Sequence, residues 1–202
     1  MQVKICGLNI TRDVQLCIDL QVNLLGFVFY EKSPRNTNLK DIDILNKYNK
    51  KNSSFVAVTV NPTDYFIKEN LLGNFEYIQL HGSETNERVS EIKNMGFKII
   101  KAIKVKEKKT IDKYKEFTSA DIILFDTPGM EKSLEFPKNL ITKLPQGENY
   151  ALAGSVSEDN LQNFYKLGVN FFDLSSSLES QLGYKDHLKI KSFMIKINEL
   201  KN

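Results

Sequence analysis

A chain of 202 residues with 41% hydrophobic and 26% charged side chains has the composition of a folded domain, which excludes extended disorder. Its 28 lysines and arginines nearly balance 25 aspartates and glutamates, so the formal charge is only +3 and nucleic-acid binding is not expected. No apolar run approaches the roughly 20 residues of a membrane span, and no secretory leader is visible. We therefore expect a cytoplasmic protein.

Cysteine and histidine are scarce in this sequence. Two of each are too few for a disulfide framework and leave no zinc-ligand spacing, so no metal site is expected. Cys17 lies on the apolar face of a predicted helix and is expected to pack in the core. Cys6 ends a predicted strand and needs a separate explanation.

Short apolar runs alternate with longer amphipathic segments along the chain. Runs rich in Val, Ile and Phe, apolar at successive positions, are typical of strands buried on both faces, as in a parallel sheet covered by helices. Eight strands are predicted at 3–6, 24–30, 55–60, 77–80, 97–103, 121–126, 150–154 and 171–176.

The segments between these runs have helical spacing and helix-end signals. Thr11, Ser83 and Ser157 are N-cap candidates, because a short hydroxyl side chain accepts a hydrogen bond from a first-turn N–H group. Gly96 and Gly168 are placed to end two of the helices. Helices are predicted at 11–22, 84–95, 157–167 and 186–200, with weaker signals at 39–49, 63–72, 109–117 and 137–144.

Eight alternating strand–helix units favour one particular architecture. Alternation implies a parallel sheet with right-handed crossovers, and eight units of this total length fit a (βα)₈ barrel near its lower size limit. An open doubly wound sheet is the alternative, but no Gly-x-Gly-x-x-Gly follows the first strand. We expect residues 1–202 to form a single (βα)₈ TIM barrel, eight parallel strands with outer helices. Its site should lie at the carboxyl ends of the strands.

The residues at these predicted strand ends form recognisable motifs. They are KICG (4–7), GFVFYEKSPR (26–35), QLHG (79–82), LFDT (124–127), LAG (152–154) and FDLSSSLE (172–179). In this order they resemble the phosphoribosylanthranilate isomerase family of tryptophan biosynthesis. The resemblance implies a barrel that converts N-(5-phosphoribosyl)anthranilate to 1-(2-carboxyphenylamino)-1-deoxyribulose 5-phosphate by an Amadori rearrangement. It also implies no cofactor, a small phosphorylated substrate, and a monomer or homodimer.

This reaction needs a general acid and a general base near the same sugar carbons. The resemblance makes Cys6 the base and Asp126 the acid. A thiol in the positive field of a phosphate-binding mouth is expected to have a depressed pKa. The alternatives are a small buried hydrophobe for Cys6 and a turn or cap residue for Asp126.

Substrate-binding residues follow from the same resemblance. Arg35 matches an arginine that contacts the anthranilate carboxylate, and a guanidinium fork suits a planar carboxylate. Gln79 and His81 match residues that line the site, although His81 could instead be a structural hydrogen-bonding group. Phosphate is expected at the mouth of the last two strands. The matching residues there are Gly154, Ser155, Asp173, Ser175 and Ser176.

The sequence departs from the family pattern at three places. Ser155 and Ser177 stand where the family often has glycine, which allows the closest backbone approach to a phosphate. The segment 126–137, the expected cover of the site, has one glycine and no tryptophan, so closure over the substrate should be weaker. Two alternatives stay open: a phosphosugar isomerase with another substrate, and a catalytically weak barrel that binds a phosphorylated ligand.

Overall fold

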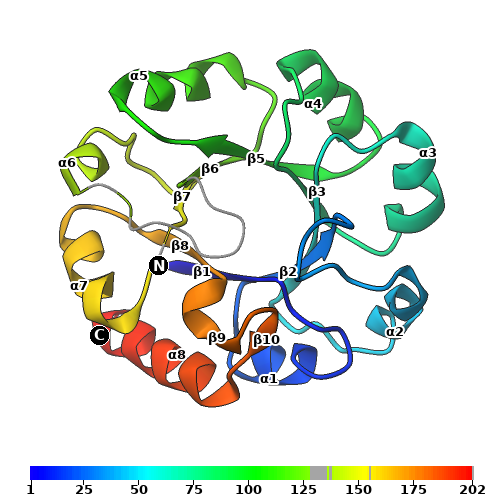
Figure 1. The fold of residues 1–202 in the computed structure, drawn as a ribbon, viewed down its shortest axis with the longest axis horizontal. Helices are drawn as coiled ribbons and strands as arrows, with labels where there is room; N and C mark the ends of the chain where they lie inside the picture. The colour runs from blue at the N-terminus through cyan, green and yellow to red at the C-terminus, as the bar shows by residue number, and fades with distance from the viewer. Residues whose placement is uncertain (128–135, 137, 155, 202) are drawn as a thin grey trace.

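The computed structural model describes residues 1–127, 136, 138–154 and 156–201, and its centre is a closed barrel of eight parallel strands (Figure 1). Each strand pairs with the next, and β8 pairs with β1, with Gln2 opposite Phe171 and Ile5 opposite Leu174. The strands are β1 (Gln2–Cys6), β2 (Leu24–Phe29), β3 (Ser54–Thr59), β4 (Tyr77–Leu80), β5 (Lys98–Lys104), β6 (Ile122–Asp126), β7 (Tyr150–Leu152) and β8 (Phe171–Leu174). The predicted fold class and its eight strands are confirmed.

Helices surround this barrel on the outside (Figure 1). They are α1 (Val14–Asp19), α2 (Ile42–Leu45), α3 (Asp64–Phe66), α4 (Asn86–Lys93), α5 (Lys108–Ile111), α6 (Lys138–Ile141), α7 (Glu158–Lys166) and α8 (His187–Lys201). Shorter helical turns are η1 (Leu39–Asp41), η2 (Ile67–Leu71), η3 (Asp112–Glu116) and η4 (Ser176–Leu178). An antiparallel hairpin of β9 (Glu179–Gln181) and β10 (Tyr184–Lys185), absent from the prediction, lies between β8 and α8.

Two of the three predicted helix starts are wrong. The Thr11 hydroxyl donates to the side chain of Asn9 at 2.9 Å, and α1 begins only at Val14. The Ser83 N–H donates to the side chain of Asn61, while Thr85 caps α4. Ser157 caps α7, as predicted, through a capping box.

The strands separate two apolar layers. Residues at every second position point into the barrel and form an inner core: Leu24, Val28, Val56, Val58, Ile100, Ala102, Ile122, Leu124, Ala151, Ala153 and Phe171. The residues between them pack outward against the helices, where Phe27 contacts Phe55 edge to face. Cys17 belongs to this outer core and is fully buried, which confirms its predicted packing role.

Two kinds of feature are absent from the part of the chain that the structure describes. None of its helices is long and apolar enough to cross a membrane. The same residues contain no group of three or more His, Cys, Asp or Glu side chains that could hold a metal ion.

Candidate active site

A cavity of about 380 Å³ opens at the carboxyl ends of the barrel strands. Nine of the ten residues predicted for the site line it: Cys6, Arg35, Gln79, His81, Asp126, Gly154, Asp173, Ser175 and Ser176. The tenth, Ser155, lies outside the described residues, as does segment 128–135 of the expected cover. The cavity therefore gathers residues from both halves of the chain.

Strand alternation explains why these side chains share one cavity. Inner-core positions recur every second residue, so Asp126 points inward like Ile122 and Leu124 of the same strand. Asp173 likewise follows Phe171 by two positions. Because all eight strands are parallel, their last inward positions meet at one end of the barrel.

A hydrogen-bonded chain of three side chains runs across this cavity. The Nε2 atom of His81 lies 3.2 Å from an oxygen of Asp126, and its Nδ1 atom lies 3.1 Å from the amide nitrogen of Gln79. If the amide donates to Nδ1, the imidazole carries its proton on Nε2 and donates to Asp126. The other oxygen of Asp126 accepts the N–H of Thr127 at 2.8 Å. His81 thus contacts the candidate acid directly.

Cys6 lies beside a buried ion pair. The ammonium group of Lys4 is 3.0 Å from each oxygen of Asp173, and both side chains are almost completely buried. Burial alone would lower the pKa of Lys4, but the Asp173 carboxylate raises it above its ordinary value. Because Lys4 contacts both oxygens of Asp173, the geometry favours a role for Asp173 in holding Lys4 rather than in binding phosphate.

The expectation of a depressed pKa for Cys6 is wrong. Burial of the thiol raises its pKa, and the Asp173 carboxylate acts in the same direction. The positive charges of Lys4 and Lys185 oppose that shift without reversing it. Positive charge at the mouth favours the thiolate, but the loss of solvent around the sulfur has the larger effect.

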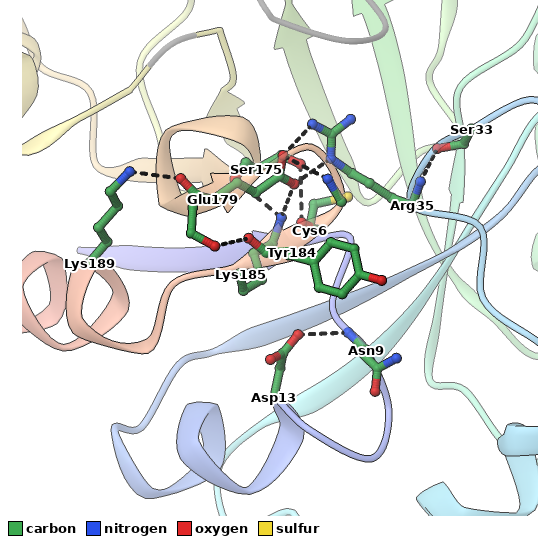
Figure 2. A network of polar contacts seen from close by, with 12 residues as sticks. Cys6, Asn9, Asp13, Ser33, Arg35, Ser175, Glu179, Tyr184, Lys185 and Lys189 are labelled. Atoms are coloured by element: carbon green, nitrogen blue, oxygen red, sulfur yellow. Dashed lines mark hydrogen bonds and ion pairs between the residues drawn. The ribbon is translucent and has the colours of Figure 1, made fainter.

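Arg35 also lines the cavity, and a carboxylate of the protein already holds its guanidinium group. Its Nε and one terminal nitrogen donate to the two oxygens of Glu179 at 2.6 and 2.8 Å (Figure 2). Lys185 donates to the same carboxylate at 2.7 Å and to the carbonyl oxygen of Ser175 at 3.2 Å. The Ser175 hydroxyl donates to the carbonyl oxygen of Cys6 at 3.2 Å.

Sequence reasoning missed three of these charged residues. Lys4 precedes Cys6 by two positions in β1, so strand alternation could have placed it below the thiol inside the barrel. Glu179 and Lys185 belong to β9 and β10, whose short segments carry no apolar alternation that would predict a hairpin.

A parallel barrel whose mouth combines a thiol, a histidine-paired carboxylate and a Gly/Ser-rich rim has the features of an enzyme for acid–base chemistry on a small anionic substrate. The family model described as N-(5'phosphoribosyl)anthranilate (PRA) isomerase matches residues 3–196. The chain belongs to this family.

Individual relatives agree with this assignment. An N-(5'-phosphoribosyl)anthranilate isomerase of Staphylococcus carnosus is 32% identical over 201 residues, with 95% of this chain and 94% of the relative covered. One from Legionella pneumophila is 34% identical over 203 residues, with coverages of 96% and 95%. A crystal structure of phosphoribosyl anthranilate isomerase with reduced 1-(o-carboxyphenylamino)-1-deoxyribulose 5-phosphate is 25% identical and has a TM-score of 0.84. The comparison covers 98% of this chain and 99% of that one.

The chain is thus an isomerase of tryptophan biosynthesis. Family membership does not favour the two alternatives, a changed substrate or a barrel that only binds its ligand.

Proposed function

We propose that Asp126 and Cys6 are the general acid and the general base of phosphoribosylanthranilate isomerisation in this chain. The observation that carries the proposal is that both side chains line one cavity at the carboxyl end of a family-matched barrel. A cytoplasmic location and a monomeric or homodimeric assembly belong to the same proposal.

The acid step begins at Asp126. Its protonated carboxyl group would give a proton to the ribose ring oxygen, so that the C1′–O bond breaks and an iminium group forms at C1′. His81 contacts Asp126 through Nε2 and orients the carboxyl group toward the cavity. One oxygen of Asp126 is fixed by the Thr127 N–H, so the carboxyl group has little freedom to rotate.

The base step uses Cys6. A thiolate at this position would remove the C2′ proton, and the electron pair of that C–H bond would form the enolamine, which then tautomerises to the ketose. The ammonium groups of Lys4 and Lys185 favour the thiolate, which burial disfavours. These two lysines therefore support the proposed base electrostatically.

Substrate orientation would depend on two groups of residues that line the cavity. We assign the anthranilate carboxylate to Arg35 and the phosphate to Gly154, Ser155, Ser175 and Ser176. Gln79 adds a further contact: its Oε1 atom is one of two buried side-chain atoms without a hydrogen-bond partner in the described part of the chain. A ribose hydroxyl group donating to Oε1 would satisfy it.

Substitution of the two catalytic candidates tests the proposal. Cys6→Ser and Asp126→Val should each lower kcat by about 10²- to 10⁴-fold, the usual contribution of an acid–base group. The assay follows the loss of fluorescence of freshly generated phosphoribosylanthranilate. Cys17→Ser, in the outer core, is the matched control and should change stability rather than kcat.

Two results would contradict the proposal. A wild-type kcat in either variant would remove that residue from its role. Binding of the substrate without turnover by the wild-type protein would instead support the alternative of a barrel that only binds phosphorylated ligands.

A further inference from the structure

Three charged side chains are buried together at the edge of the cavity, next to the hairpin of β9 and β10. The Arg35 side chain is 7% exposed, that of Glu179 5% and that of Lys185 0%. Burial raises the pKa of Glu179, but hydrogen bonds and charge from Arg35 and Lys185 outweigh it and bring the pKa to about 2. Glu179 is therefore ionised at neutral pH and holds two cations.

The contact between Glu179 and Arg35 fixes the plane of the guanidinium group. Two parallel N–H···O bonds, at 2.6 and 2.8 Å, allow one relative orientation of the two planar groups (Figure 2). The aliphatic part of Arg35 packs on Gly7, where an added Cβ would lie 2.5 Å from the arginine Cδ. The arginine is thus held between the end of β1 and the hairpin.

The hairpin itself is docked on the loop that carries Arg35. Gly183, at its turn, has a φ of +80°, and a Cβ there would lie 2.6 Å from the carbonyl oxygen of Pro34. The Gly183 N–H also donates to Glu179 at 3.2 Å. Arg35 lines the cavity, whereas Glu179 is not among the described residues that line it. A ligand in this cavity can contact Arg35, and Glu179 acts on that contact by holding the guanidinium group.

We propose that Glu179 is a positioning residue for carboxylate recognition, which acts by presetting the guanidinium group of Arg35. The inference rests on the proposed assignment of Arg35 to the anthranilate carboxylate. Lys185 connects Glu179 to the end of β8, because it donates hydrogen bonds both to Glu179 and to the carbonyl of Ser175. Burial lowers the pKa of Lys185 from its ordinary value, and the Glu179 carboxylate opposes that shift.

A double-mutant cycle tests this role. Glu179→Gln should raise KM for phosphoribosylanthranilate by about 3- to 10-fold with kcat within about twofold, since an unfixed arginine must be ordered on binding. Affinity for reduced 1-(o-carboxyphenylamino)-1-deoxyribulose 5-phosphate should fall by the same factor, while affinity for inorganic phosphate stays unchanged. In an Arg35→Gln background, Glu179→Gln should raise KM further by less than about twofold. Glu179→Asp keeps the charge and should therefore restore part of the lost substrate affinity. It replaces the glutamine variant in the test if that variant folds poorly.

A matched control and the contrary outcomes complete the experiment. Ser180→Ala removes a 3.4 Å hydrogen bond to the Tyr184 carbonyl within the same hairpin and should leave KM unchanged. A KM that is unchanged or lowered in Glu179→Gln, or an equal effect in both Arg35 backgrounds, overturns the positioning role. If Arg35→Gln alone leaves KM unchanged in an active enzyme, the assignment of Arg35 fails instead.

Discussion

At the scale of single residues, buried charge is concentrated around the candidate site. The buried lysines of the described chain are Lys4, Lys101 and Lys185, and each has a carboxylate within 3.0 Å. An ammonium group in the protein interior requires such a partner. The Lys101 pair with Glu84 also binds the backbone of the loop after His81, because Lys101 donates to the carbonyl of Gly82 at 2.9 Å. Each pair thus fixes backbone or side chains next to residues that line the candidate site.

The raised pKa of the Cys6 thiol predicts its reactivity. Because burial raises the pKa of this thiol, the alkylation rate with iodoacetamide should keep increasing with pH between about pH 7 and 9, with no plateau. Mass spectrometry of the alkylated peptide measures this rate. Cys17 is the internal control: burial raises its pKa to about 12, and it should stay unmodified while the protein is folded. A plateau below about pH 8 would contradict the raised pKa.

At the scale of secondary-structure elements, the strands were predictable and the helix starts were not. A strand that is buried on both faces has apolar residues at successive positions, so it can be recognised as a continuous apolar run. Each predicted run overlaps an observed strand. A cap depends on which hydroxyl reaches an N–H group. Ser83 and Thr85 are equivalent as residue types, but the side chain of Asn61, 22 positions earlier, engages the Ser83 N–H.

The two hydroxyl residues before α4 provide a direct test. Thr85→Ala should lower the free energy of unfolding by about 1 kcal/mol, because its oxygen accepts the Arg88 N–H at 3.3 Å. Ser83→Ala should change it by less than about 0.5 kcal/mol, since the backbone N–H of residue 83 remains bonded to Asn61. Urea unfolding of both variants measures the difference. Equal destabilisation would show that Thr85 is not the functional cap.

At the scale of the whole molecule, barrel closure brings distant residues together. We propose that residues 1–202 form one domain, because β1 pairs with β8 as well as with β2. Barrel closure also explains which parts of the site could be predicted from the sequence. Positions at strand ends follow from periodicity, but the contact of Arg35 with Glu179 joins residues 144 positions apart. Neither residue carries a local signal for its partner.

The contact of Glu179 with Arg35, which barrel closure brings about, also affects stability at low pH. Its pKa is about 2 in the folded protein against 4.5 as its ordinary value, so the folded state favours the ionised form. The resulting stabilisation is complete above about pH 4.5 and is lost as the pH falls toward 2. Between about pH 5.5 and 3, the difference in unfolding free energy between wild type and Glu179→Gln should shrink by about 2 kcal/mol.

Urea titrations of both proteins at the two pH values measure this change. Glu148→Gln, which alters an exposed side chain before β7, is the matched control and should follow the wild type at both pH values. A constant difference between wild type and Glu179→Gln would mean that Glu179 keeps an ordinary pKa. The ion pairs with Arg35 and Lys185 would then contribute little to the folded state. The expected decrease in the difference would instead show that the barrel loses stability in acid through Glu179. This is the same carboxylate that we propose positions Arg35 for substrate binding.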